Sequence, residues 1–224
     1  MAYCILRAAK IKSRVSLARA MQHNTRERVP DNADPERTKY NHSEWSTQAA
    51  MARYTELLPA KVRKNAVHAV EFIVAVPPEV AAAVKSQEDW KPIYNYLQES
   101  RNWLTARLGG TANRLNWSVH LDESSPHLHL VMMPLRDGRL SYNTYLGGSR
   151  DALVKLQTDF ANDVGKKYGL ERGRPRAVTG RRHITVGRFY AIGQAAVAQE
   201  IARQHWLAER APAMKKNRDG GHER

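Results

Sequence analysis

Hydrophobic and polar residues alternate along four short stretches of the chain, a pattern typical of strands that are buried on one face. These stretches are residues 2–11, 68–76, 113–121 and 127–133. Pro77-Pro78 and Pro134 end the second and the fourth. In the third, the apolar side chains are expected on one face and the polar ones on the other: Leu115, Trp117, Val119 and Leu121 against Asn116, Ser118 and His120.

Longer stretches repeat their apolar residues at helical spacing. They predict helices over 44–57, 88–108, 149–169 and 188–211, and Ser13 or Ser16 can cap a short helix that ends at Met21. The polar residues 23–41 are expected to form an irregular loop, and residues 171–183 a basic one. Strands interleaved with long helices predict an α+β fold, in which helices pack on a central antiparallel sheet.

The charge of the chain is large and unevenly placed. The 224 residues carry 36 Lys and Arg against 22 Asp and Glu, a net charge of +14. Residues 1–65 and 171–224 hold +7 each, while residues 66–170 are neutral. Such an excess indicates a polyanionic partner, and its position in the two flanks predicts two contributions to one binding surface.

The rest of the composition narrows the class of protein. No apolar run approaches the length of a membrane-spanning helix, and the first residues lack the layout of a signal peptide. The single Cys4 excludes an internal disulfide framework and a thiolate-rich zinc site. We therefore expect a soluble protein of the cytoplasm that binds nucleic acid.

Three histidines lie on the strand pair 113–121 and 127–133. His127 and His129 are two residues apart, so both leave the same face of their strand. His120 ends the preceding strand, and in a hairpin its side chain reaches that same face. Three converging imidazoles form a divalent-metal site, although imidazole ligands alone suit zinc, copper, nickel or manganese. Three roles are open for Glu123 in the turn: a further metal ligand, a general base, or a residue that orients a ligand. Asp122 is expected only as a turn residue.

This hairpin resembles the metal motif of the Mob/Pre plasmid mobilisation relaxases, which belong to the HUH endonucleases. The matching pattern is His-x-Asp-Glu-x-x-Pro-His-x-His-x-x-x-x-Pro at 120–134. Two further stretches match in order, namely His23-Asn24-Thr25-Arg26-Glu27 with Asn32, Asp34 and Asn41, and the strand at 66–76. The stretch from His183 to Tyr190 is a weaker match, so the resemblance covers about residues 2–190.

The resemblance implies a metal-dependent DNA relaxase for conjugative mobilisation. Such an enzyme nicks one strand of plasmid DNA at an origin of transfer and stays attached to the new 5′ phosphate. It implies His23 as the nucleophile, His120, His127 and His129 as ligands of Mn²⁺ or Mg²⁺, and Glu123 as the acidic residue that orients His23 and accepts its proton. Residues 1–190 would be the catalytic domain, and residues 191–224 a helix with a disordered basic tail.

The DNA surface is expected to combine the two basic flanks. Arg26 is expected to contact a phosphate with two hydrogen bonds. The other candidates are Lys10, Lys12, Arg14, Arg176, Arg181 and Arg182. Affinity should then fall steeply with salt. Trp45 and Tyr40 are candidates for stacking on bases.

Several alternatives stay open at this point. Related initiators and transposases use tyrosine, so Tyr40 and Tyr190 compete with His23, and a DNA-binding module with a structural metal is a third possibility. Family members are usually longer, and their additional helical region is associated with dimerisation and with contacts to the transfer machinery. A homodimer formed through such a region and a conjugative coupling protein are therefore expected partners.

Overall fold

The computed structural model describes residues 2–86, 88–173 and 178. It separates a compact unit that ends at Gly173 from a second unit, residues 174–224. The predicted helix 188–211, the tail, His183, Tyr190, Arg176, Arg181 and Arg182 all lie outside the described residues. The predicted domain boundary at residue 190 therefore stays a prediction.

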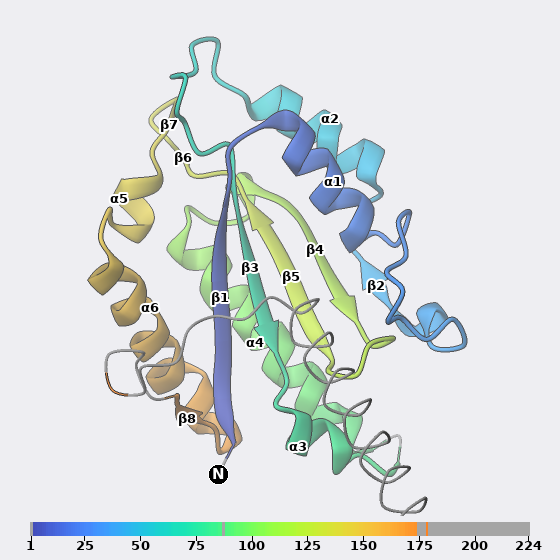
Figure 1. Ribbon diagram of the computed structural model, residues 1–224. Helices are drawn as coiled ribbons and strands as arrows, with labels where there is room; N and C mark the ends of the chain where they lie inside the picture. Colours follow the sequence, from blue (N-terminus) through green and yellow to red (C-terminus); the bar gives the residue numbers. More distant parts are fainter. Residues whose placement is uncertain (1, 87, 174–177, 179–224) are drawn as a thin grey trace, which may run out of the picture. The chain divides into compact units, whose positions relative to one another are not determined.

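A six-stranded sheet in the order β2-β4-β5-β3-β1-β8 forms the centre of the first unit (Figure 1). Its strands are β1 (Tyr3–Ile11), β2 (His42–Ser43), β3 (Ala69–Ala75), β4 (Arg114–His120), β5 (His127–Met132) and β8 (Glu171–Arg172). All neighbours are antiparallel except β1 and β8, which are parallel. The predicted α+β fold with a central antiparallel sheet is confirmed, and β2 and β8 are short edge strands that the sequence pattern did not predict.

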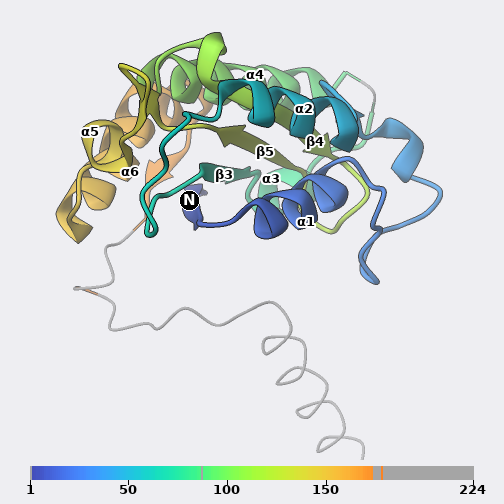
Figure 2. The same cartoon turned by 90° about the horizontal axis from the view of Figure 1, so that it is seen from above.

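Helices cover both faces of this sheet, with α4 on one face and α1 on the other (Figure 2). The helices are α1 (Arg14–Asn24), α2 (Thr47–Leu57), α3 (Pro78–Ala82), α4 (Trp90–Arg107), α5 (Tyr142–Leu146) and α6 (Arg150–Asp163). Short 3-10 turns occupy Thr38–Tyr40, Thr111–Asn113 and Gly165–Tyr168, and a small hairpin pairs β6 (Leu135–Arg136) with β7 (Arg139–Leu140).

The larger hydrophobic core lies between the sheet and the helices α4 and α6. It includes Phe72 of β3, Leu128 and Leu130 of β5, and Leu97 and Phe160 of the helices. A smaller core lies on the other face under α1 and α2, where Leu17, Met21 and Tyr54 are buried. Because this second core covers only part of its face, the sheet leaves room there for polar side chains.

A β-bulge corrects one detail of the predicted strand pattern. The pairing of β4 with β5 skips Leu115, since Arg114 pairs with Met132 and Asn116 with Val131. Leu115 therefore packs into the smaller core, and Val119 into the larger one, although simple alternation placed both on one face. A bulge inserts one residue into one strand and so shifts every later side chain relative to the partner strand.

The first helix also differs from its prediction. Ser13 caps it as expected, since its side chain accepts a hydrogen bond from Ser16 N at 3.1 Å. The helix continues to Asn24, however, rather than ending at Met21. His23 and Asn24 thus stand on its last turn and not in the loop, so the helix fixes their position against the sheet.

Candidate metal centre

Three imidazoles meet on the α1 face of the hairpin formed by β4 and β5. His120 and His127 are paired across the two strands, and His129 follows two residues later. Their ring centroids are 5.0, 4.7 and 4.9 Å apart for the pairs 120–127, 120–129 and 127–129. All three are buried. The structure thus brings together the three histidines that the period-two pattern predicts on one face.

Each ring uses one nitrogen for a contact that requires a donor. The Nε2 atom of His120 lies 2.9 Å from the carbonyl oxygen of Asn24, and Nδ1 of His127 lies 2.8 Å from that of Ser125. Nδ1 of His129 lies 2.9 Å from Oε1 of Glu71. Carbonyl and carboxylate oxygens only accept, so in each neutral ring this nitrogen carries the hydrogen and the other one keeps a lone pair.

The remaining nitrogens have the character of metal ligands. Nδ1 of His120 and Nε2 of His127 face each other at 3.3 Å, and with both hydrogens engaged elsewhere they present two lone pairs. Nε2 of His129 is buried and has no hydrogen-bond partner among the described residues. Lone pairs in such close approach cost free energy unless a cation lies between them, so the donor set fits a divalent ion.

Burial keeps two of these ligands, His120 and His127, neutral. It lowers the pKa of His120 to about 2 and that of His127 to about 4. Only a neutral imidazole can bind a metal, so proton release from these two rings does not limit binding at physiological pH.

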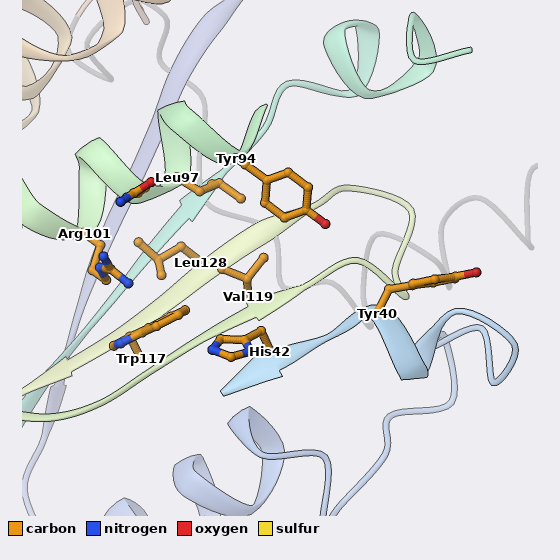
Figure 3. A pocket seen from close by; sticks show the side chains of 9 residues that line it. Tyr40, His42, Tyr94, Leu97, Arg101, Trp117, Val119 and Leu128 are labelled. Atoms are coloured by element: carbon orange, nitrogen blue, oxygen red, sulfur yellow. The ribbon is translucent and has the colours of Figure 1, made fainter. Parts of the chain in front are cut away.

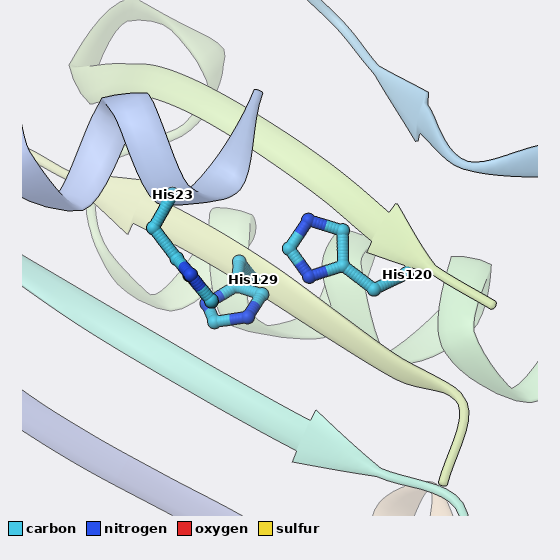
Figure 4. Close-up of side chains that lie close together, drawn as sticks. All are labelled: His23, His120 and His129. Carbon is cyan, nitrogen blue, oxygen red and sulfur yellow. The ribbon is translucent and has the colours of Figure 1, made fainter. Parts of the chain in front are cut away.

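His23 approaches His120 and His129 from the end of α1, as Figure 4 shows. Its ring centroid lies 5.5 Å from that of His120 and 5.3 Å from that of His129. Partial burial, the neighbouring His129 and the charge of Arg26 lower the pKa of His23. A neutral imidazole with a free lone pair therefore stands beside the metal centre, and it remains accessible from outside.

Arg26 is bound to carboxylates, in contrast to the phosphate contact that the sequence suggested. Its Nε and Nη2 atoms donate to Asp122 at 3.0 and 2.6 Å, and Nη2 also donates to Glu123 at 2.8 Å. The side chain is only 6% exposed. Arg26 adopts a left-handed backbone conformation, with φ of 60°, which turns the chain sharply after α1. A contact to DNA stays a prediction, and the structure shows Arg26 as a support for the turn.

Asp122 is buried and accepts hydrogen bonds from several side chains, so it is not an ordinary turn residue. Besides Arg26, it accepts hydrogen bonds from Thr38 Oγ1 at 3.2 Å and Asn41 Nδ2 at 2.6 Å. Burial opposes its ionisation, but the bonds from Arg26 and Asn41 outweigh that effect and lower its pKa to about 2. The carboxylate thus ties the polar segment 34–41 to the hairpin.

Glu123 lies beside the metal ligands but is not hydrogen-bonded to His23 in the described structure. Its Oε1 atom is 3.9 Å from Nε2 of His127, and its Oε2 atom accepts from Asn32 Nδ2 at 3.0 Å. Burial would raise its pKa, but the hydrogen bonds from Arg26 and Asn32 lower it. Glu123 is therefore an ionised carboxylate. Among the described residues, two groups have potential ligand atoms within 4.8 Å of one another: His120 with Glu123 and His127, and His120 with His129 and His23.

Sequence reasoning missed Glu71. It projects from β3 on the histidine face, accepts from His129 and Asn24 Nδ2 at 2.9 Å each, and is partly buried. Burial opposes its ionisation, but its bonds with His129 and Asn24 lower its pKa. Its place in an otherwise apolar strand was the only available signal, since a polar residue inside such a strand needs a partner.

The basic residues near the N-terminus line a separate hollow of about 480 Å³. Lys10 and Lys12 are joined there by Arg63 and Lys64, which the sequence did not single out. Arg14 lies exposed at the start of α1. Lys10 also lies over the ring of Tyr142 at 4.2 Å. Four cations in one hollow make it a candidate phosphate contact.

The profile of the family described as "Plasmid recombination enzyme" (Mob/Pre) matches residues 1–191. The chain belongs to this family. It is 29% identical to plasmid recombination enzyme type 1 of Staphylococcus aureus over 206 residues, which are 84% of this chain and 49% of that protein. It is 32% identical to a 65 kDa protein of Zymomonas mobilis over 183 residues, 76% of this chain and 30% of that protein. The chain spans about half the length of the plasmid recombination enzymes that it matches.

Solved structures support the same assignment of the fold. The Mn-bound MobM relaxase domain in complex with plasmid pMV158 oriT DNA superposes with a TM-score of 0.70. It is 24% identical and is matched over 85% of this chain and 99% of that one. Another structure of that domain on the same origin DNA has a TM-score of 0.68 at 25% identity. The predicted relaxase fold is thereby confirmed.

No helix within residues 2–86 and 88–173 combines the length and the hydropathy that a bilayer crossing requires.

Proposed function

We propose that this Mob/Pre family member is a metal-dependent DNA relaxase. It nicks one strand at a plasmid origin of transfer and transfers that strand through a covalent bond between His23 and the 5′ phosphate, for conjugative mobilisation. The observation that carries the proposal is the accessible His23, whose pKa is lowered by burial, beside the buried imidazoles of His120 and His129. The oriT DNA and manganese bound to the MobM relaxase domain, and the excess of positive charge, support this choice of substrate and ion class.

In the proposed reaction, a lone pair of the His23 imidazole attacks the scissile phosphorus. A P–N bond forms, the bond from phosphorus to the 3′ oxygen breaks, and the 3′ oxygen leaves and takes up a proton. When bound, a divalent ion at His120, His127 and His129 supplies charge that polarises the phosphate. The P–N bond retains the free energy of the broken ester, so a 3′ hydroxyl can attack it and rejoin the strand.

The other residues of the site position these groups. Glu71 accepts from His129 and holds that ring with Nε2 aimed into the centre, which fixes its tautomer. Arg26 holds the turn with Asp122 and Glu123 against the end of α1. Glu123, ionised and near His127, is the carboxylate that we propose to take the proton that His23 loses after the transfer.

The described structure weakens the case for the competing nucleophile Tyr40. This tyrosine is 59% exposed and lines a hollow together with Trp117 and Val119 of β4. Those two side chains leave the strand on the face opposite to His120, because they are one and three residues away from it. Tyr40 thus lies beside the face of the hairpin that carries Trp117 and Val119, whereas His23 lies over the face that carries the histidines.

Relaxation of a supercoiled plasmid that carries the chain's own origin, with Mn²⁺ or Mg²⁺ present, tests this function. His23→Ala should abolish nicking and the covalent adduct, and Tyr40→Phe should still form the adduct. Loss of the adduct with Tyr40→Phe alone would favour a tyrosine initiator or transposase. The absence of any nicking by the unchanged protein would favour a DNA-binding module with a structural metal.

The expected partners are part of the same proposal. Origin DNA, single-stranded or folded as a hairpin around the nick, is the substrate. A conjugative coupling protein and a homodimer are predictions that follow from the family, and so is the location in the bacterial cytoplasm.

A further inference from the structure

An aromatic groove lies on the sheet face opposite to the metal centre, between α4 and the β2–β4 edge (Figure 3). It consists of two hollows, of about 330 and 820 Å³, that share Tyr40 and Tyr94 and therefore adjoin each other. The apolar floor of the smaller hollow is formed by Leu97, Val119 and Leu128. Concave surfaces of this size with an apolar floor accommodate small planar ligands.

Flat side chains form the walls of this aromatic groove. The rings of His42 and Trp117 lie 4.9 Å apart at 38°, and the guanidinium of Arg101 lies 4.3 Å from the ring of Trp117. Tyr94 is 47% exposed and Tyr40 is 59% exposed. Aromatic rings and arginine planes that remain exposed are the surfaces on which unpaired bases stack.

The charge of the aromatic groove suits a polyanion. Arg101 lines the smaller hollow, and Arg37 and Lys91 line the larger one. Among the described residues that line either hollow there is no Asp or Glu. A positively charged groove with interleaved aromatic rings is typical of proteins that bind single-stranded nucleic acid along its backbone.

One end of the groove lies close in sequence to the metal centre. Leu121, which lines the larger hollow, directly follows the metal-binding His120. Between them runs the segment 34–42, which bonds to Asp122 through Asn41 on one side and presents Arg37 and Tyr40 to the groove on the other. A single strand bound at the metal centre would have to cross this segment to enter the groove.

We propose that the aromatic groove is a second DNA site, which binds a single-stranded stretch outside the metal centre. Bases stack on Tyr94, Tyr40 and the Arg101 guanidinium, and the phosphates lie against Arg37, Lys91 and Arg101. The inference rests on the proposed function for its ligand, but it concerns binding and not nicking.

Fluorescence anisotropy of the full chain with a labelled, unstructured oligothymidylate tests the proposal. Without added metal and with a chelator present, the measurement reports binding alone, so it succeeds or fails independently of whether His23 is the nucleophile. Tyr94→Ser should weaken binding about 10-fold, in the range of a lost base stack. Arg101→Gln should weaken binding and also reduce the slope of log affinity against log salt by about 0.7, because one phosphate contact is lost. Tyr94→Ser should leave that slope unchanged.

The chain offers matched controls for both changes. Arg107 lies on the same helix and over Trp103 at 4.1 Å, the same arrangement as Arg101 over Trp117, but it is not among the groove-lining residues. Tyr3 is 42% exposed on β1. Arg107→Gln and Tyr3→Ser should both bind the oligonucleotide like the unchanged protein, and thermal unfolding of all four variants checks that they fold.

A second measurement needs no variant. Photo-crosslinking of the unchanged chain to an oligonucleotide with 5-iododeoxyuridine should yield peptides that contain Tyr94 or Trp117. Crosslinks confined to peptides of the α1 face would overturn the proposal, and so would equal affinity of Tyr94→Ser, Arg101→Gln and the two controls. A change of oligomeric state in Tyr94→Ser without a change in DNA affinity would assign the groove to a second copy of the chain instead.

Discussion

The two faces of the β4–β5 hairpin differ in what their side chains contact. Leu128 and Leu130 point into the larger core and touch apolar residues of α4 and of the neighbouring strands. His127 and His129, which alternate with them, point to the other face, and each of their anchored nitrogens contacts an oxygen atom outside the ring. One strand thus supplies stability through one set of residues and a candidate metal centre through the other.

This difference shows how a metal site can be rigid without being part of the core. The leucines are fixed by close packing in the larger core. The histidines are fixed instead by single hydrogen bonds to Asn24 of α1, Ser125 of the turn and Glu71 of β3. Three different segments therefore determine the orientation of the rings, and loss of one partner should change function more than folding.

The largest expected contrast comes from two neighbouring residues of β5. His129→Asn keeps a donor close to Glu71 but removes the nitrogen aimed into the metal centre. It should reduce metal-dependent nicking more than about 100-fold, since even loss of a partner behind a ligand costs about 10–100-fold. The free energy of unfolding of the metal-free protein should change little. Leu130→Ala should lower that free energy by about 2–5 kcal/mol and keep nicking at temperatures where the protein is folded.

Urea unfolding together with a nicking assay measures both effects. Equal losses of stability in the two variants would show that His129 belongs to the core and would remove the distinction between the faces.

The next contrast concerns two partly buried carboxylates, Glu71, which is paired with His129, and Glu44, which is paired with Arg114. Glu71→Gln should weaken Mn²⁺ binding about 10–100-fold in calorimetry, because a neutral amide holds the His129 ring less firmly and lowers its basicity. Glu44, which is paired with Arg114 at similar exposure, provides the control. Glu44→Gln should leave Mn²⁺ affinity unchanged, and equal weakening in both variants would contradict a specific role for Glu71.

The pH dependence of the free energy of unfolding should also distinguish the histidine face of the hairpin from its apolar face. The pKa of His120 is lowered to about 2, whereas an unfolded chain protonates its histidines at about 6.5. Below pH 6.5 the unfolded state therefore binds more protons, and the stability of the metal-free protein falls as the pH is lowered. Between pH 6.5 and 5 the loss should be about 2 kcal/mol for this one residue. Urea unfolding at the two pH values checks it.

The variant His120→Gln provides the comparison for this pH effect. It removes the titrating group and keeps a side-chain donor for the carbonyl oxygen of Asn24. A pH dependence as steep as that of the unchanged protein would contradict burial of a neutral His120.

The smallest expected effect concerns Lys12, which lies on neither face of the hairpin. Lys12→Gln removes one of four cations from the hollow near the N-terminus. If that hollow contacts DNA phosphates, the slope of log affinity against log salt should decrease by about 0.7–0.9, with only a few-fold loss of affinity at moderate salt. A salt titration of origin DNA binding measures this slope, and an unchanged slope would exclude the contact.

The sequence predicted that the three histidines lie together because their geometry is local. A two-residue spacing on a strand and a short turn suffice to place His120, His127 and His129 together, and no distant residue enters that argument. The same holds for the helix that corresponds to α4, which has a regular apolar stripe. His23 became a candidate only through the family resemblance.

The supports of the site could not be predicted, because they depend on strand order and register. Glu71 precedes His129 by 58 residues, and only the pairing of β3 with β5 brings the two together. Arg26 is a surface cation by sequence, and its 96-residue separation from Asp122 concealed their ion pair. The bulge at Leu115 gave no recognisable local signal either.

Mass spectrometry of the peptide that carries the nucleotide tests the central claim most directly. The unchanged chain is incubated with origin DNA and Mn²⁺, digested with nuclease and protease, and the modified residue is identified under conditions that preserve P–N bonds. The account predicts a nucleotide on His23, in an acid-labile linkage that is absent from His129→Asn. A nucleotide on Tyr40 or Tyr190, in an acid-stable ester, would contradict it.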